Sequence, residues 1–241
     1  DLQKPPPLPP RKTVFAHMTD PRRLEQEEPN RIVVYVHRDD CWVWTIPFSN
    51  GNTSVGYVSN PEFFEKYTGT LEEQFRGMIA DEPALQQRFG EAELIFEPRV
   101  LQGWSATTDT FWGKGFILTG NVTEFLDPIF SSGVTLATVS AQTAAKLVIR
   151  HLNGEAVDFQ KEYTEPTMQG VSVFRTYVNS WYDGTLFKIF FAENKTEEFK
   201  AQICSVLAGY VWDQTNPFVR THEKSVKTLA RFLDNAKTTA Q

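Results

Sequence analysis

Residues 120–133 read GNVTEFLDPIFSSG, and this stretch joins a short apolar run to a long helical pattern. The run in front of it, residues 115–119 (GFILT), predicts a buried strand. Behind it, apolar or small residues recur at helical spacing from Val134 to Leu152, with Ser131 or Ser132 placed to cap the first turn and Gly154 just past the end. A strand, a loop and a helix start together aim unpaired backbone amides and a positive dipole end at one point. Such a point suits an anion or the electron-rich edge of a heterocycle.

The plainer interpretation is that this junction only turns the chain, as many strand–loop–helix junctions do. Its length and composition argue for more. The 11 residues from Val122 to Ser132 exceed what a turn needs, and they carry Asp127-Pro128 and two serines directly before the helix. We therefore expect a binding loop.

A second informative stretch is residues 42–47, WVWTIP. Alternation along a strand puts Trp42, Trp44 and Ile46 on one face, so that two indoles stand side by side. Paired tryptophans on a strand usually belong to a core, and composition alone favours that structural role.

The two stretches together resemble motifs of one family, the flavin-dependent halogenases and their monooxygenase relatives. Residues 120–133 are similar to the flavin-contacting motif of that family, which pairs a Gly-Asp with a later Asp-Pro and Phe-Ser-Ser-Gly. Residues 42–47 match its W-x-W-x-I-P motif, whose indoles keep the substrate away from the flavin. The motifs occur in family order, and the resemblance runs from about Arg11 to His151.

The resemblance implies FAD as the cofactor, reduced flavin and oxygen as reactants, and either halogenation of an electron-rich ring or transfer of an oxygen atom to the substrate. Chloride in a halogenase would lie near the amides of Ser132 and Gly133. The expected catalytic group comprises Trp42, Trp44, Ile46 and Pro47. The expected cofactor-binding residues are Gly120, Asn121, Asp127, Pro128, Ser131, Ser132, Gly133 and Val134.

Two positions depart from the family pattern. Asn121 stands where the family usually has an Asp that holds a ribityl hydroxyl, and an amide accepts such a bond without charge assistance. Phe130 stands where tryptophan halogenases carry a Glu. The second departure disfavours free tryptophan and favours a small aromatic or carrier-protein-bound substrate. A flavin reductase and halide are further partners that the resemblance implies.

Two alternatives from other classes stay open. One is a non-catalytic partner- or carrier-binding module on a degenerate flavoprotein frame, which Asn121 favours. The other is a flavin reductase or dehydrogenase without oxygen chemistry.

Composition sets further bounds on function. The 24 basic and 30 acidic residues give a net charge of −6, which argues against a general nucleic-acid binder. No run has the length of a membrane span and no signal segment opens the sequence, so we expect a cytoplasmic protein. Cys41 and Cys204 lie far apart, as in proteins of a reducing compartment. The four histidines have no metal-ligand spacing, so no metal site is expected.

The element pattern predicts an α/β (mixed α+β) protein. We expect a proline-rich connector (1–12), an antiparallel substrate-domain sheet with a helical insertion (13–107), the C-terminal part of an FAD-binding domain (108–155) and a helical C-terminal region (156–241). Within these, strands are expected at 32–37, 41–47, 53–58 and 93–107, with a hairpin turn at 50–52, and helices between 61 and 89, with Asn60 and Thr70 as caps. Further along, a helix with an apolar face is expected to stop at Asp183-Gly184; the residues of this face are Val171, Phe174, Tyr177, Val178 and Trp181. Two more helices are expected from Glu197 to Val211 and from His222 to Ala236, separated by a break at Asn216-Pro217. No G-x-G-x-x-G occurs, so the N-terminal, Rossmann-like FAD-binding segment is expected to be missing.

Several single residues carry weaker expectations. Asp127 is expected to brace its loop or to reach the flavin, and Glu124 to be solvated. Two positions are considered for Arg175, one close to a ligand and one at the surface, and the surface position is favoured. A pocket between the helical region and the sheet is expected from an aromatic cluster, which comprises Trp181, Tyr182, Tyr210 and Trp212.

Overall fold

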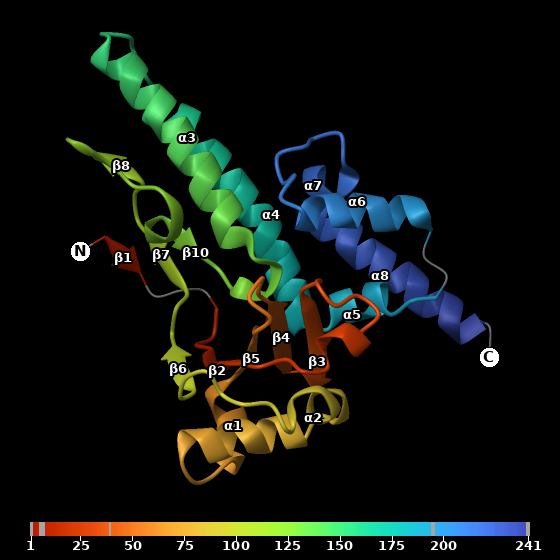
Figure 1. Ribbon diagram of the computed structural model, residues 1–241. Helices are drawn as coiled ribbons and strands as arrows, with labels where there is room; N and C mark the ends of the chain where they lie inside the picture. Colours follow the sequence, from red (N-terminus) through yellow and green to blue (C-terminus); the bar gives the residue numbers. More distant parts are fainter. Residues whose placement is uncertain (1, 5–7, 39, 194–195, 240–241) are drawn as a thin grey trace. The chain divides into compact units, whose positions relative to one another are not determined.

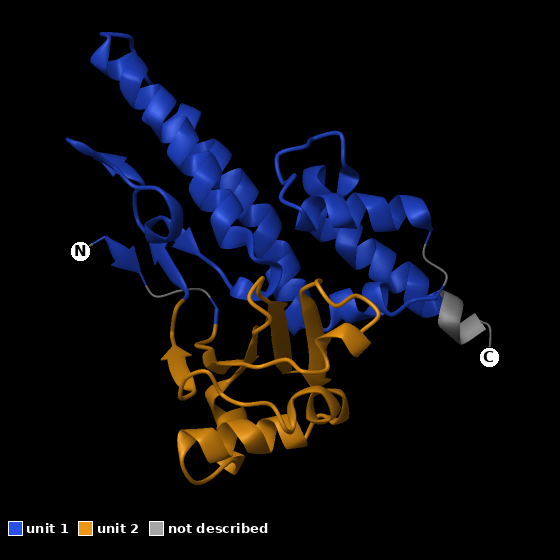
Figure 2. Cartoon of the chain, in the orientation of Figure 1, with its two compact units in different colours: residues 1–8, 105–241 blue, residues 9–104 orange. Residues whose placement is uncertain are grey.

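The antiparallel sheet predicted from the N-terminal sequence forms the centre of one of two compact units, residues 9–104; the other combines residues 1–8 with 105–241 (Figures 1 and 2). The computed structural model describes residues 2–4, 8–38, 40–193 and 196–239, with the backbone alone for 236–239. Pro5–Pro7 of the predicted connector lie outside these residues. The mixed α/β class is confirmed.

The sheet of residues 9–104 has five antiparallel strands in the order β3-β4-β5-β2-β6. The turn between β4 and β5 is the predicted one: Gly51 has φ +90° and the Asn52 amide donates to Asn50 Oδ1 at 3.1 Å. The strands are β2 (Lys12–Met18), β3 (Val33–Arg38), β4 (Cys41–Pro47), β5 (Thr53–Ser59) and β6 (Arg99–Gln102).

One face of this sheet packs against short helices to make the core of the unit. Both predicted caps form: Asn60 accepts from the Phe63 amide, and Thr70 makes a reciprocal capping box with Glu73. These helices are η2 (Pro61–Lys66), α1 (Leu71–Ala80) and α2 (Pro83–Phe89). The 3₁₀ turn η1 (Arg23–Glu25) has no buried residue. The core includes Val14, Ala16, Met18, Val43, Val55, Tyr57, Phe75, Met78, Ile79, Leu85 and Phe89.

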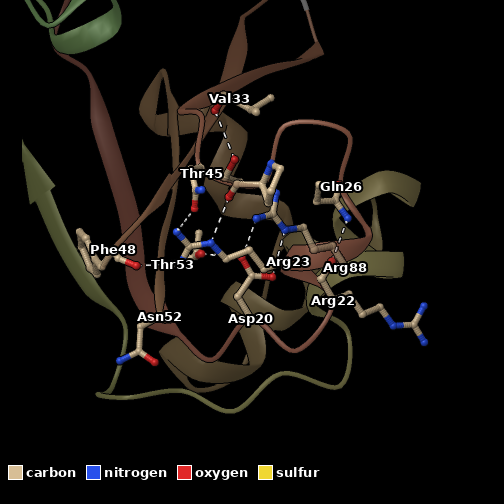
Figure 3. Close-up of polar contacts among 12 residues, drawn as sticks. Asp20, Arg22, Arg23, Gln26, Val33, Thr45, Phe48, Asn52, Thr53 and Arg88 are labelled. Carbon is tan, nitrogen blue, oxygen red and sulfur yellow. Dashed lines mark hydrogen bonds and ion pairs between the residues drawn. The ribbon is translucent and has the colours of Figure 1, made fainter. Parts of the chain in front are cut away.

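A buried ion pair ties α2 to this sheet (Figure 3). Arg88 donates through Nε and a terminal nitrogen to the two carboxylate oxygens of Asp20, at 3.1 and 2.6 Å. Thr53 also donates to Asp20, at 2.5 Å. The bidentate geometry satisfies both charges away from water.

In the other unit, α3 (Ser132–Leu152) and α4 (Glu165–Tyr182) run side by side (Figure 1). The π-helical turn η5 (Gln160–Thr164) precedes α4, and Gly184 follows it with φ +78°. The predicted apolar face of α4 is buried throughout, as Val171, Phe174, Tyr177, Val178 and Trp181 show.

The described residues after α4 form four further helices: α5 (Thr185–Phe190), α6 (Glu197–Leu207), α7 (Pro217–Arg220) and α8 (His222–Thr239). The predicted break before Pro217 is present, and Asn216 caps α7. Helix α6 ends before the predicted Val211 because Gly209 adopts φ +101°. Among the described residues, none of the helices has both the length and the apolarity that crossing a membrane requires.

The remaining strands are short. A three-stranded sheet has the order β1-β7-β10, and β8 pairs with β9 alone. The extended run predicted for 93–107 is divided between two sheets, since Gly103 turns the chain with φ +67°. The strands are β1 (Gln3–Lys4), β7 (Ala106–Thr108), β8 (Trp112–Gly113), β9 (Phe116–Ile117) and β10 (Glu124–Phe125).

The prediction of a buried strand over residues 115–119 was wrong. Only Phe116–Ile117 is a strand, and the Phe116 side chain is 42% exposed. Gly115, at φ +82°, turns the chain immediately before Phe116, so this strand forms one arm of a short hairpin and pairs with Trp112–Gly113. An apolar run predicts burial only where enough sheet exists to cover both of its faces.

Candidate functional site

A groove of about 660 Å³ lies at the start of α3, within the range of small-molecule sites. It contains six of the eight residues expected to bind a cofactor. The complete lining is Thr119, Gly120, Asn121, Phe125, Pro128, Ser131, Gly133, Val134, Ala137 and Ala141. Four of these residues were not expected at the site, although Gly133, Ala137 and Ala141 recur at intervals of four and form a stripe of small residues on one helix face.

The loop enters the groove through the 3₁₀ turn η3 (Gly120–Val122). Gly120 adopts φ +64°, its amide donates to Ser140 Oγ at 3.0 Å, and its carbonyl accepts from Thr123 Oγ1 at 2.6 Å. A Cβ on Gly120 would lie 3.1 Å from the Ala137 Cβ. Both the left-handed backbone and the close approach to α3 therefore favour glycine at this position.

Asp127 is buried inside the loop and is not part of the groove lining. It caps the 3₁₀ turn η4 (Pro128–Phe130) by accepting from the Ile129 amide at 3.0 Å. Its other oxygen accepts from the Tyr182 hydroxyl at 3.0 Å. These contacts match the loop-bracing role, the first of the two roles considered for this residue.

Ser131 is the single non-glycine residue with a positive φ among those that the structure describes, at φ 52° and ψ 27°. It occupies the N-cap position of α3 without a side-chain capping bond, and Ser132 is the first, buried helical residue. The predicted serine cap is therefore wrong, because the left-handed backbone of Ser131 replaces the extended one that side-chain capping uses. Residues held in such sparsely populated backbone regions cluster at functional sites.

The start of α3 can receive an anion. Helix geometry leaves the amides of Ser132, Gly133 and Val134 without carbonyl partners one turn earlier, and the dipole adds positive potential there. The described lining contains no carboxylate to oppose it.

The absence of a side chain at Gly133 opens the groove toward these amides. A Cβ built there would contact Phe125 Cε2 at 3.4 Å and Asn121 Oδ1 at 3.5 Å, and both of these residues line the groove. A side chain at this position would thus fill a cradle that glycine leaves free. The residues present fit the anionic, planar end of a reduced flavin.

Two expectations next to the groove were wrong. Glu124 is 2% exposed rather than solvated, and it accepts a charge-assisted hydrogen bond from Arg175 at 2.6 Å. Arg175 is therefore not a surface arginine that extends its charge into water. The partners are 51 residues apart in sequence, so no local pattern could have paired them.

The W-x-W-x-I-P residues lie on β4, in the unit of residues 9–104. Trp42 and Trp44 stand side by side as predicted, with ring centroids 5.9 Å apart, and Trp42 is 3% exposed. Trp44 lies flat over Gly56, where a Cβ would come within 2.2 Å of the indole, and donates to Ser54 Oγ at 3.1 Å. The groove-facing residues and these indoles belong to different units. Ile46 and Pro47 are half-buried at the end of the same strand.

The four aromatic residues expected to share a pocket have separate surroundings. Trp181 packs edge-on against Phe130, Tyr182 contacts Asp127, and Trp212 donates to the Pro166 carbonyl at 2.7 Å. Tyr210 is 65% exposed. Among the described residues, no three or more His, Cys, Asp or Glu side chains gather as metal ligands.

Comparisons with known proteins agree with the two motifs. The family described as tryptophan halogenase matches residues 25–224. A chlorinase of pyrrolyl-carrier protein from Pseudomonas fluorescens is 26% identical over 79% of this chain and 43% of its own length. Sulochrin halogenase from Aspergillus terreus is 29% identical over 55% of this chain and 26% of its own.

A solved structure is also similar to this chain. A flavoprotein/dehydrogenase from Cytophaga hutchinsonii is 49% identical with a TM-score of 0.94, over 98% of this chain and 58% of that one. The chain thus spans between about a quarter and three fifths of the length of these relatives. Because the family match covers most of its residues, the chain belongs to the tryptophan halogenase family.

Proposed function

We propose that this chain forms part of an FAD-dependent oxidoreductase of the halogenase and monooxygenase type, and that the groove at the start of α3 contacts the flavin. The observation that carries the proposal is the coincidence of three features at one place. The motif loop, a groove of suitable size and a helix start without a side-chain cap all meet around Gly133. The family of this chain and two relatives that are named as flavin-dependent halogenases support it.

The residues of the groove have distinct roles in this proposal. The amides of Ser132, Gly133 and Val134 would hold the negatively charged pyrimidine end, an interaction of about 0.3–2 kcal/mol. The Asn121 amide oxygen would accept a hydrogen bond from a hydroxyl of the cofactor. Gly120 would keep the loop close to α3.

Bound FAD, when reduced, would supply two electrons to O2, and the halide or the substrate would supply the other two as it is oxidised. The chain would orient the cofactor and control access to it. Trp42 and Trp44, both on β4 and with Trp44 packed on Gly56, would keep the substrate away from the flavin. Cys41 is buried, Cys204 exposed, and both are free thiols, which supports the cytoplasmic setting that we propose.

The nature of residue 130 supports a substrate other than free tryptophan. Phe130 packs edge-to-face against Trp181, with centroids 5.9 Å apart, so an apolar contact stands where a carboxylate would orient an indole. Two relatives are named as halogenases of pyrrole carried on a carrier protein. We therefore propose a small aromatic or carrier-bound acyl substrate, with halide and a flavin reductase as further partners.

A second candidate is a flavin dehydrogenase or reductase without oxygen chemistry, which the name of the Cytophaga hutchinsonii relative favours. A third candidate is a non-catalytic carrier-binding module, which Asn121 in the groove lining favours. Product analysis separates the three. The protein expressed from its complete coding sequence is supplied with reduced FAD, oxygen, bromide or chloride, and free or carrier-bound pyrroles and phenols.

A halogenated or hydroxylated product supports the proposal. Oxidation of the substrate or reduction of the flavin with no oxygen or halogen incorporated would favour the dehydrogenase. Carrier binding without any turnover would favour the binding module.

A further inference from the structure

Two buried carboxylates in the loop of residues 120–133 accept hydrogen bonds from helix α4. Arg175 donates to Glu124 Oε1 at 2.6 Å, and Tyr182 donates to Asp127 Oδ2 at 3.0 Å. The two donors are seven residues apart, which places them two turns apart on one face of the helix. Trp181, the neighbour of Tyr182 on α4, also packs its ring against the ring of Phe130.

These contacts flank Phe125, one of the residues that line the groove. Glu124 lies in β10, directly before Phe125, whose ring faces the Gly133 position. Asp127 starts the 3₁₀ turn that leads into the strained Ser131. Fixing the two carboxylates therefore fixes the groove wall and the entry to α3.

The Glu124–Arg175 pair is poorly arranged for stabilising the fold. Glu124 is 2% exposed, yet its second oxygen and the Arg175 Nε are both buried without a hydrogen-bond partner. Taking charges out of water is costly unless all their hydrogen bonds are satisfied, so such a pair adds little net stability. By contrast, the Asp20–Arg88 pair uses both carboxylate oxygens. The Glu124–Arg175 pair, which uses one carboxylate oxygen, is better explained by the loop conformation that it holds.

We propose that Arg175 and Tyr182 are positioning residues, which hold residues 120–133 in the conformation that forms the groove. The ligand part of this inference rests on the proposed flavin contact, whereas the conformational part does not.

Hydrogen–deuterium exchange of the loop amides tests the conformational part. Arg175→Met removes the charged donor and keeps most of the apolar stem, and we expect exchange in residues 121–131 to accelerate about tenfold, the effect of losing one charged hydrogen bond. Tyr182→Phe, which removes one hydroxyl, should give a smaller acceleration confined to 127–131. Exchange in β2, β4 and β5 should not change.

Two further variants separate positioning from general destabilisation. Arg175→Met leaves Glu124 charged and buried, so the paired change Glu124→Gln with Arg175→Met removes both charges. We expect this pair to keep the wild-type melting temperature while the loop still exchanges faster. The matched control is Arg150→Met, since Arg150 forms ion pairs with Glu155 and Glu162 elsewhere in the same unit.

Affinity for FAD, measured in the protein expressed from its complete coding sequence, tests the ligand part. We expect Arg175→Met to weaken binding about tenfold and Arg175→Lys to restore part of it, because lysine keeps the charge but not the planar donor geometry. Loop exchange at the wild-type rate in both Arg175→Met and the paired variant would overturn the inference. Faster exchange with unchanged FAD affinity would support the positioning role and refute the proposed flavin contact instead.

Discussion

Replacing Gly133 tests where the cofactor binds, because this residue stands between the groove and the first amides of α3. An added Cβ meets its neighbours at 3.4 and 3.5 Å, which is ordinary van der Waals contact, so Gly133→Ala requires no rearrangement. Alanine also suits a helix better than glycine. The folded chain should therefore be at least as stable as the wild type.

The effect on binding follows from the interaction that is lost. A ligand displaced from the first-turn amides loses about 0.3–2 kcal/mol, which corresponds to a roughly 2- to 30-fold increase in Kd. Gly133→Leu extends further into the groove than Gly133→Ala and should lie at the upper end or beyond it.

The assay is fluorescence titration of FAD with each variant, together with a thermal unfolding curve. Ala145→Leu is the matched control, since Ala145 is exposed on α3 and is absent from the groove lining. Wild-type FAD affinity in a folded Gly133→Leu protein would refute the placement of the flavin.

Three further predictions concern stability. Arg88→Met leaves Asp20 charged and buried and should lower the free energy of unfolding by about 3–5 kcal/mol in urea titrations; a loss below 1 kcal/mol would contradict the role of this pair. Gly56→Ala places a methyl group 2.2 Å from the Trp44 ring and should cost about 1–3 kcal/mol and alter the near-ultraviolet circular dichroism, whereas an unchanged spectrum would show that the indole does not lie over this glycine. Burial lowers the pKa of His222, so the unfolded chain takes up the proton first as pH falls: this stabilisation is present above about pH 6.5, the ordinary histidine pKa, and is lost as the pH falls through the lowered value. His222→Asn should flatten the dependence of the melting temperature on pH over that acidic range, and a curve parallel to the wild type would contradict the assignment.

Local sequence patterns predicted much of this structure. The alternation in residues 42–47 placed Trp42 and Trp44 on one strand face, and the turn and cap residues around Gly51 and Thr70 marked the element boundaries. The loop of residues 120–133 was identified from its composition and its position before a helix, and most of the residues expected to bind the cofactor line one groove. These features depend on neighbours within a few residues, which the sequence displays directly.

The features that were missed depend on contacts between distant segments. The pairing of Glu124 with Arg175 joins a short strand to a helix, and no property of either segment selects the other. The left-handed conformation of Ser131 is imposed by the way η4 meets α3, since serine itself favours the extended cap. The prediction of a buried strand at residues 115–119 failed for a related reason. Whether an apolar run is buried depends on the helices and strands that the rest of the chain packs against it.

The most direct test of the central claim is the visible absorption spectrum of the protein, expressed from its complete coding sequence, after addition of FAD and desalting. The proposed function predicts a retained flavin band with one FAD for each chain, and a band that is lost or weakened in Gly133→Leu. Absence of retained flavin in a protein whose full length is verified by intact mass would contradict the account and favour a module that binds a partner without a cofactor.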